Sequence, residues 1–201
     1  MSAGVQLGIF GREAPAFDAS FARLRRTELP DDAWFDYVPG WLSGHESVFE
    51  SLVGSVRWRS EERQMYDRIV DVPRLYAVLP DDGPLLPILE SARRTLSQQY
   101  DEDFQRTSLG YYRNGQDSVA FHGDYVAREM DRALVATVSV GAPRRFLMRP
   151  TGGGKSIALT LGWGDLLVMG GTCQRTWQHA IPKVKHALPR IAIMFRPVWT
   201  K

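Results

Sequence analysis

The part of the chain after about residue 107 limits the possible folds most strongly, because it reads as a series of short β-strands. The segment ALVATVSVGAPRRFLMRP, residues 133–150, is rich in β-branched residues and is interrupted by Gly-Ala-Pro. SIALTLGWGDLLVMGG predicts two short strands around a glycine turn, and RIAIMFRPV predicts another. Short strands separated by glycine and proline are typical of a β-sandwich or a double-sheet jelly roll.

Two helical patterns come before these strands. Residues 43–54 predict a helix with Ser43 as its N-cap and Glu46 completing a capping box, so that His45 would be exposed in the first turn. The apolar positions of residues 84–100 keep helical spacing, with two prolines in or near the first turn. We therefore expect an α+β fold, in which the N-terminal helices cover one sheet of a double-stranded β-helix (jelly roll) core.

The same patterns suggest how the chain is organised. A length of 201 residues suits one domain, and 44% hydrophobic residues are enough to bury a core. We expect residues 1–30 to form an N-terminal arm and residues 31–201 to form a single domain. Within that domain, residues 31–106 would supply helices and substrate-lid hairpins, and residues 107–201 would supply the jelly-roll core.

The composition bears on the cellular setting. The single cysteine, Cys173, excludes an intrachain disulfide and fits a reducing compartment. No signal peptide is evident, and no apolar run reaches ~18 residues. We expect a protein of the cytoplasm, or of the nucleus in a eukaryote, that is neither secreted nor embedded in a membrane. The net charge of +2 argues neither for nor against nucleic-acid binding.

The tripeptide His122-Gly-Asp124 is the first candidate site. His122 and Asp124 are two residues apart, so on an extended chain the imidazole and the carboxylate point to the same side. His179, which follows another predicted strand, is the histidine that a jelly roll could bring beside them. Two histidines and one carboxylate with open positions are the ligand set of non-heme Fe(II) oxygenases, whereas structural zinc prefers closed sets with cysteine. On spacing alone, a surface turn remains the alternative interpretation.

Two arginines in the last predicted strand form the second candidate site. Arg190 and Arg196 are six residues apart, so a strand directs both to the same face. Inward-facing arginines in an apolar strand are costly unless they meet anions. A dicarboxylate co-substrate would satisfy both. The alternative is that each pairs with a buried acid, although Asp165 is one of few acids in this region.

Four segments occur in one order along the chain: YYRNGQDSVAFHGD, ATVSVGAPRRFLMR, GDLLVMGGTCQRTWQHAIPK and RIAIMFR. Together they resemble the core of the AlkB family, which are Fe(II)- and 2-oxoglutarate-dependent dioxygenases that repair alkylated nucleobases. The resemblance runs from about Leu109 to Pro197. It extends more loosely to DDAWFDYVPGWL and to the VRWR and VPR segments, and so includes most of the chain after residue 30.

The resemblance implies roles for individual residues. His122, Asp124 and His179 resemble the catalytic iron ligands of the family, with 2-oxoglutarate and O2 as co-substrates. Arg190 resembles the arginine that pairs with the distal carboxylate of 2-oxoglutarate, and Arg196 the second arginine of the R-x5-R signature. Tyr112 resembles the tyrosine that hydrogen-bonds the co-substrate. Gln174 and Trp177 match the stretch that leads to the third ligand, where Trp177 is expected to pack rather than react.

The chain departs from the family pattern at three positions. The family usually has Asn-x-Tyr where this chain has Gly110-Tyr-Tyr, and R-x-N where it has Ala192. In the family both asparagines hydrogen-bond the co-substrate. Family repair enzymes often carry an acidic residue, facing the target base, two places after the iron-binding aspartate, where this chain has Val126. These differences bear on co-substrate affinity and on which base edge can be recognised.

The implied activity is oxidative dealkylation of N-alkylated bases in DNA or RNA that is single-stranded or flipped out, by a monomeric enzyme. Stacking candidates are Trp58, Tyr66 and Tyr76. Candidates for phosphate contact are Arg57, Arg59, Arg63, Arg68 and Arg74. An amphipathic hairpin with solvated arginines is the plainer interpretation of this segment. Two alternatives stay open: an oxygenase of the same fold acting on a protein or small molecule, and a catalytically silent nucleic-acid-binding module.

Overall fold

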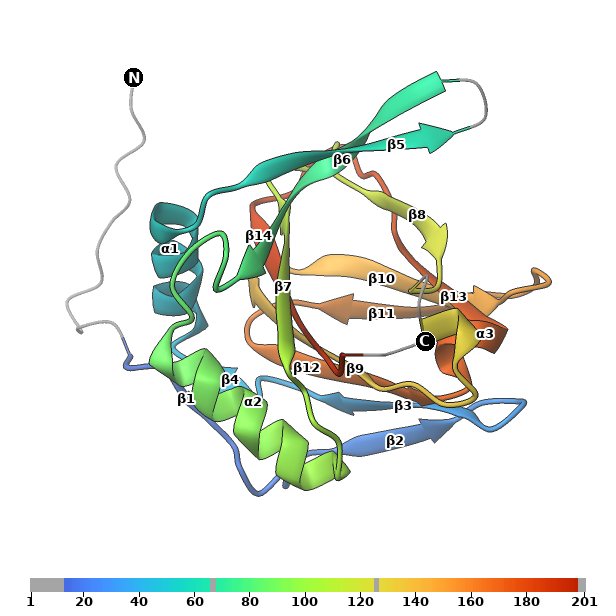
Figure 1. Cartoon of the computed structure of the whole chain (residues 1–201), viewed down its shortest axis with the longest axis horizontal. Coiled ribbons are helices and arrows are strands. Elements are labelled where there is room, and N and C mark those ends of the chain that lie inside the picture. The colour runs from blue at the N-terminus through green and yellow to red at the C-terminus, as the bar shows by residue number, and fades with distance from the viewer. Residues whose placement is uncertain (1–12, 66–67, 125–126, 199–201) are drawn as a thin grey trace.

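The computed structural model describes residues 13–65, 68–124 and 127–198. Two β-sheets face each other at its centre (Figure 1). The strands of the larger sheet are, from edge to edge, β2 (Arg25–Glu28), β3 (Ala33–Val38), β12 (Asp165–Gly171), β9 (Val135–Gly141), β14 (Arg190–Arg196), β7 (Arg106–Tyr112), β6 (Arg68–Leu79) and β5 (Arg59–Met65). The smaller sheet consists of β11 (Ile157–Leu161), β10 (Arg144–Pro150), β13 (Trp177–Ile181) and β8 (Val119–His122).

The strands from β7 to β14 form the double-stranded β-helix that the sequence predicts. Four of them, β7, β9, β12 and β14, lie together in the larger sheet, and the other four make the smaller one. The expected break between β9 and β10 and the expected glycine turn between β11 and β12 are both present. Although β14 comes last, it pairs with β7 on one side and β9 on the other.

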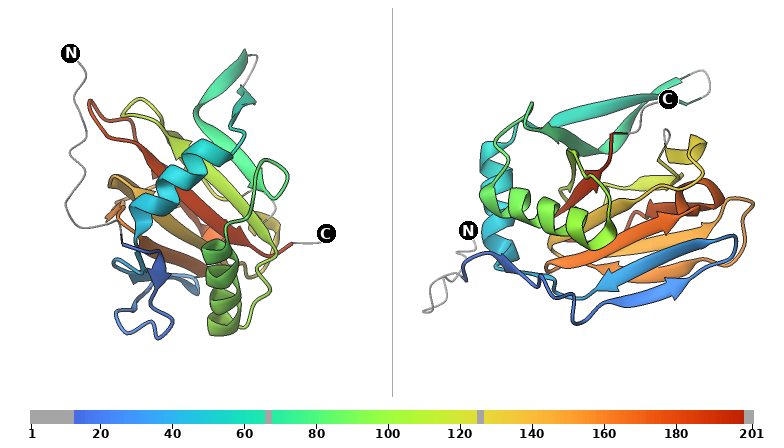
Figure 2. Two further views of the ribbon diagram at one scale, coloured as in Figure 1. Left: turned by 90° about the vertical axis from the view of Figure 1, so that its left-hand side faces the viewer. Right: turned by 60° about the horizontal axis from the view of Figure 1, so that its bottom comes forward.

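Two helices cover the outer face of the larger sheet, as expected (Figure 2). They are α1 (His45–Ser55) and α2 (Pro87–Tyr100). Leu52 and Leu96 bury their side chains against Ile193 and Phe195 of β14 in one apolar cluster. A second cluster, which includes Tyr112 and Ala192, fills the space between the sheets. None of the helices in the described residues is long and apolar enough to cross a membrane.

The alternation of side chains along β14 connects the core to the site. Ile191, Ile193 and Phe195 belong to the cluster under the helices, whereas Arg190 and Arg196 line a cavity on the other face of the sheet. Successive side chains of a strand point to opposite faces, so one sequence repeat serves both purposes.

The start of α1 differs from the prediction. Ser43 lies in β4 (Leu42–Ser43), and the N-cap is Gly44, whose φ of 59° is left-handed and which makes no side-chain cap. A Cβ at Gly44 would lie 2.6 Å from the Glu13 carbonyl oxygen, so close packing of the N-terminal segment demands glycine here. His45 is consequently covered, with 12% of its side chain exposed, and the expectation that it is exposed was wrong.

The N-terminal segment is also more integrated than an arm. Residues 25–28 form β2, which pairs with β3 inside the larger sheet, and β1 (Ala16–Phe17) pairs with β4. The sheet therefore crosses the boundary expected at residue 30.

We expect Gly164→Ala to lower the free energy of unfolding by about 3 kcal/mol, and Gly153→Ala by only about 1 kcal/mol. Both glycines have positive φ, 84° and 92°. A Cβ at Gly164 would lie 1.8 Å from the Leu42 carbonyl oxygen, whereas nothing lies within 4 Å of one at Gly153. Urea unfolding of the two variants measures the difference. Equal losses would show that only the backbone conformation matters.

Candidate active site

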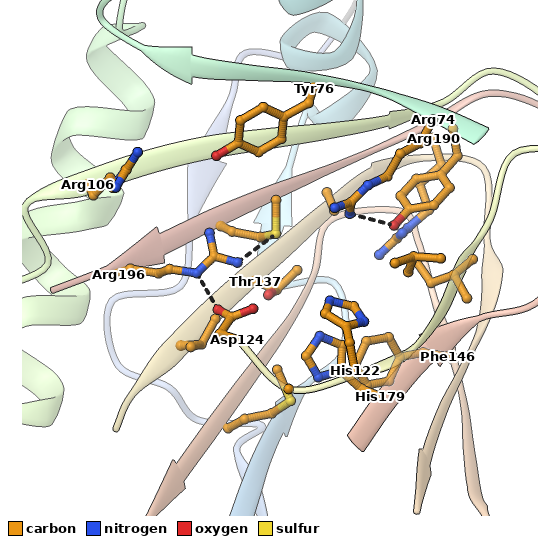
Figure 3. Close-up of a pocket in the computed structure, with 18 of the residues that line it drawn as sticks. Arg74, Tyr76, Arg106, His122, Asp124, Thr137, Phe146, His179, Arg190 and Arg196 are labelled. Atoms are coloured by element: carbon orange, nitrogen blue, oxygen red, sulfur yellow. Dashed lines mark hydrogen bonds and ion pairs between the residues drawn. The ribbon is translucent and has the colours of Figure 1, made fainter. Parts of the chain in front are cut away.

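A cavity of about 590 Å³ lies between the two sheets and receives side chains from both (Figure 3). The larger sheet contributes Tyr112, Thr137 and the arginines of β14, and the smaller sheet contributes His122 and His179. The cavity therefore collects most of the residues that the sequence singled out.

His122, Asp124 and His179 converge in this cavity, and their candidate ligand atoms all lie within 4.8 Å of one another. The two histidines are opposite each other in the β8–β13 pair, with ring centroids 4.3 Å apart. The His122 Nδ1 atom lies 2.9 Å from the carbonyl oxygen of Ala120. A carbonyl only accepts, so Nδ1 carries the proton and Nε2 carries the lone pair.

The surroundings of His179 and Asp124 favour the protonation states that bind metal ions. Burial, followed by the neighbouring His122, lowers the pKa of His179 to about 3. Burial is the largest single influence and opposes ionisation of Asp124, but the charge and hydrogen bond of Arg196 together with the nearby histidines outweigh it and hold the carboxyl pKa at about 2. Neutral imidazoles beside an ionised carboxylate are the forms that coordinate a metal ion.

Gln174 holds the backbone of the segment that carries Asp124. It lies on the short helix α3 (Cys173–Thr176) and is 1% exposed. Its Oε1 accepts a hydrogen bond of 3.0 Å from the Asp124 N–H, and its Nε2 donates to the Met169 sulfur at 3.8 Å. One side chain thus connects the chain just after β8 to the segment that leads into β13.

We expect Gln174→Leu to weaken binding of Fe(II) or Co(II) about tenfold, because partners that orient ligands typically contribute that much to metal affinity. Gln178→Leu is the matched control, since Gln178 precedes His179 on β13 and contacts Arg149 instead. Titration with Co(II), followed by its absorption spectrum, measures both affinities. Equal affinities in the two variants would contradict the positioning role.

Arg190 is a buried cation that forms no ion pair within the described residues. It is 1% exposed, and its Nη2 donates to the Ser139 hydroxyl at 2.7 Å. Among the described residues, its Nε and Nη1 have no hydrogen-bond partner, and burial lowers its pKa to about 10. Asp165, the acid considered from the sequence, accepts hydrogen bonds from Tyr37 and Gly40 instead. Arg190 therefore suits an anionic ligand.

Arg196 differs from Arg190, because it forms an ion pair with Asp124 and also donates to the Ser108 hydroxyl. The alternative of a buried acid partner thus applies to Arg196, with a candidate metal ligand as the acid. The ion pair fixes the carboxylate beside the histidines (Figure 3).

These residues fit an iron ion and 2-oxoglutarate. The two histidines and one carboxylate are a ligand set that leaves positions open for other molecules. The unsatisfied donors of Arg190 suit the carboxylate of a co-substrate that enters the same cavity. Trp177 is 6% exposed and packs in the core between the sheets, as expected.

The substrate candidates fall into different places. Arg74 and Tyr76 line the cavity. Trp58 does not, because its ring packs 5.0 Å from that of Tyr111 in the cluster under the helices, so its assignment as a stacking residue was wrong. Tyr66 and Val126 lie outside the described residues, as do the side chains of Arg63 and Arg68.

Two further arginines, Arg57 and Arg59, form ion pairs with the buried carboxylate of Asp82. This carboxylate also accepts the Val78 N–H at 2.8 Å. These arginines therefore hold the base of the β5–β6 hairpin together, rather than lying free for phosphates.

Arg106 is a cavity residue that the sequence did not reveal. It begins β7, is exposed, and lines the open end of the cavity with Pro197 and Val198. An arginine at the start of a strand reads as an ordinary solvated residue. Its signal is the antiparallel register, which places Arg106 opposite Arg196.

Comparison with known proteins gives consistent results. The pattern of the 2OG-Fe(II) oxygenase superfamily matches residues 38–196. The alpha-ketoglutarate-dependent dioxygenase alkB homolog 3 of Bos taurus is 31% identical over 80% of this chain, and the DNA oxidative demethylase ALKBH2 of Homo sapiens is 29% identical over 76%. The chain spans 65% and 68% of the lengths of these two relatives.

Solved structures share the fold at low sequence identity. A 2OG-Fe(II) oxygenase family oxidoreductase from Burkholderia pseudomallei has a TM-score of 0.55 at 13% identity, over 81% of this chain and 84% of its own. OsALKBH1 has a TM-score of 0.54 at 14% identity, over 81% of this chain and 96% of its own. Both support the double-stranded β-helix.

Proposed function

The chain belongs to the AlkB family within the 2OG-Fe(II) oxygenase superfamily, and from this premise we propose that it oxidatively dealkylates N-alkylated nucleobases. The reaction uses Fe(II), 2-oxoglutarate and O2, and the protein acts as a monomer on single-stranded or flipped-out DNA or RNA. The names of the two relatives, a dioxygenase of the alkB type and a DNA oxidative demethylase, support this proposal.

The residues of the cavity have separate roles in this function. His122, Asp124 and His179 hold the iron, which together with 2-oxoglutarate and O2 supplies the oxidising power for hydroxylating a C–H bond. Arg190 binds the distal carboxylate of 2-oxoglutarate. Tyr112 donates its hydroxyl proton to the same co-substrate, and Arg196 keeps the Asp124 carboxylate in place.

Hydroxylation of the alkyl carbon gives a hemiaminal, which breaks down to an aldehyde and the unmodified base. The side chains around the histidines confine this chemistry. Phe146 stacks on His179 with ring centroids 5.5 Å apart, and Val135 and Met169 line the cavity nearby. Apolar walls of this kind limit the access of water to the oxidising centre.

The positive charge of the cavity is the main observation that supports an anionic substrate. Four arginines line it, Arg74, Arg106, Arg190 and Arg196, against one described carboxylate, that of Asp124. The charges of Fe(II) and of 2-oxoglutarate offset each other, so positive charge remains for the substrate. Phosphates next to the target base provide the matching negative charge. Tyr76, at the same cavity, can stack on that base.

A panel of oligonucleotides tests this function. Single-stranded DNA and RNA that contain 1-methyladenine or 3-methylcytosine are incubated with the enzyme, Fe(II) and 2-oxoglutarate, and both succinate and the repaired base are measured. We expect repair of at least one lesion, with more succinate than the unmodified strand produces. If 2-oxoglutarate is consumed but every lesion persists, the enzyme acts on another substrate class. If no succinate forms at all, the chain is not an oxygenase.

A further inference from the structure

Arg74 lies at an irregularity in β6 and lines the cavity. On β5, Ser60 pairs with Leu75 and the next residue, Glu61, pairs with Val72, so that Pro73 and Arg74 have no partners there. Proline has no N–H for the ladder and is tolerated at such a bulge. The carbonyl of Pro73 instead accepts the Ser118 N–H at 2.6 Å. Arg74 and Tyr76 are two residues apart on β6 and both line the cavity, so the alternation of side chains along the strand directs Arg74 inward.

The guanidinium of Arg74 is held against the hydroxyl of Tyr112. Only 7% of Arg74 is exposed, and its Nη1 donates to the Tyr112 oxygen at 3.3 Å (Figure 3). The aromatic ring of the same tyrosine lies 5.5 Å from Cζ of Arg190. Tyr112 thus stands between two buried arginines, one at its hydroxyl and one at its ring.

Gly110 provides the space that Arg74 occupies. It lies two residues before Tyr112 on β7 and opposite Tyr76 in the ladder with β6. A Cβ at this position would meet Nη1 of Arg74 at 3.5 Å, which is ordinary contact, but any longer side chain would extend into the guanidinium. Because Gly110 has no side chain, the guanidinium of Arg74 can lie beside it.

The hydrogen bond from Arg74 to Tyr112 limits the direction in which the Tyr112 hydroxyl can donate its proton. A phenol has one proton to donate, and here its oxygen accepts from Arg74. The proton of Tyr112 must then point away from Arg74, toward the remainder of the cavity. A nearby positive charge also strengthens a phenol as a donor to an anion.

We propose that Arg74 is a positioning residue: by its hydrogen bond to Tyr112 it directs the Tyr112 hydroxyl proton at a carboxylate of bound 2-oxoglutarate. Gly110 leaves the space in which the Arg74 guanidinium lies. This inference rests on the proposed function, since it concerns the co-substrate of the same site. It gives Arg74 a role toward the co-substrate instead of the phosphate contact expected from the sequence.

The test compares Arg74→Gln and Arg74→Lys with the exposed strand arginine Arg145 changed to Gln as control. Succinate is measured without a nucleic-acid substrate at varied 2-oxoglutarate. We expect Arg74→Gln to raise KM for 2-oxoglutarate about tenfold with kcat within about twofold, since one hydrogen bond to a charged group is lost. Arg74→Lys, which keeps a charged donor, should restore part of the affinity. Arg145→Gln should match the wild type.

Two further variants separate positioning from general damage. Tyr112→Phe removes the hydroxyl, so adding Arg74→Gln to it should cause little further loss of 2-oxoglutarate affinity. If the two residues acted independently, the fold-losses of the two single variants would multiply in the double variant. Gly110→Leu should imitate Arg74→Gln by displacing the guanidinium, whereas Gly110→Ala should not. Isothermal titration of 2-oxoglutarate into the Mn(II)-loaded protein measures binding without turnover, and circular dichroism confirms that each variant is folded.

The outcomes are distinguishable. If the wild type neither binds nor turns over 2-oxoglutarate, the proposed function fails. If the wild type is active but Arg74→Gln keeps the wild-type KM for 2-oxoglutarate, the inference alone is wrong. A rise in the KM for methylated nucleic acid with an unchanged KM for 2-oxoglutarate would assign Arg74 to the substrate and overturn the inference as well.

Discussion

Replacing Asp124 by alanine should reduce iron-dependent succinate formation to background while the protein still folds. Asp124 is the only carboxylate among the three converging candidate ligands, and its pKa of about 2 keeps it ionised at every pH at which the enzyme would work. Two neutral histidines alone bind Fe(II) weakly, because the charged ligand is missing. The same change takes from Arg196 its acid partner.

Metal binding and folding are measured separately to interpret this result. Co(II) titration should show at least tenfold weaker binding for Asp124→Ala. The unfolding free energy should fall by about 3 kcal/mol, because the partly buried Arg196 loses its ion pair. Asp131→Ala is the control, since Asp131 is also paired with an arginine, Arg175, but is 99% exposed. Wild-type turnover in Asp124→Ala would refute the ligand assignment.

Replacing Arg190 by methionine should have opposite effects on binding and on stability. The KM for 2-oxoglutarate should rise about a hundredfold, from the ~3 kcal/mol that loss of a buried charge-assisted contact costs. The protein without co-substrate should be no less stable, and even more stable by about 1 kcal/mol. The reason is the lowered pKa of Arg190, which shows that burial disfavours its charged form in the folded state. An apolar side chain removes that penalty.

Arg144→Met is the matched control for this prediction, because Arg144 is similarly buried but both of its Nη atoms donate to carbonyl oxygens, with only its Nε lacking a partner among the described residues. At 3% exposure, its guanidinium donates to the carbonyl oxygens of Asn114, Asp117 and Pro182, each at 2.9 Å. Methionine would leave these carbonyls without their donor, which should cost about 3 kcal/mol. Thermal unfolding with and without 2-oxoglutarate compares the two variants. A destabilised Arg190→Met would mean that Arg190 is structural and not kept for a ligand.

The parts of the site that could be predicted are those encoded by local periodicity. Arg190 and Arg196 are six residues apart and reach one face of β14, and the two-residue spacing of His122 and Asp124 predicted their convergence although β8 ends at His122. The double-stranded β-helix was recognisable for the same reason, since its strands are short and separated by glycine and proline.

The parts that could not be predicted depend on contacts between distant segments. Ser43 has the residue type of an N-cap, but the close approach of Glu13 to Gly44 decides where α1 begins. Trp58 is a residue type that often stacks on bases, but its ring packs against Tyr111 of β7. No local pattern reveals either neighbour.

Gln174 and Arg106 were not identified as working residues for a related reason. Gln174 lies on a helix of four residues, and it accepts a hydrogen bond from the backbone of Asp124, 50 residues earlier in the chain and just after β8. Arg106 lines the cavity only because β7 and β14 pair in a register that places it opposite Arg196. Both roles follow from pairings that a single sequence does not display.

The position of β14 makes the packing of the fold and the lining of the cavity depend on one strand. The strand is inserted between β7 and β9, and its two faces complete the packing under the helices and the charged wall of the cavity together. A variant that ends before residue 190 keeps His122, Asp124 and His179, but it lacks Arg190, Arg196 and a central strand of its larger sheet. We therefore expect deletion of β14 to disturb the packing and the cavity together, so single substitutions in this strand are the informative variants.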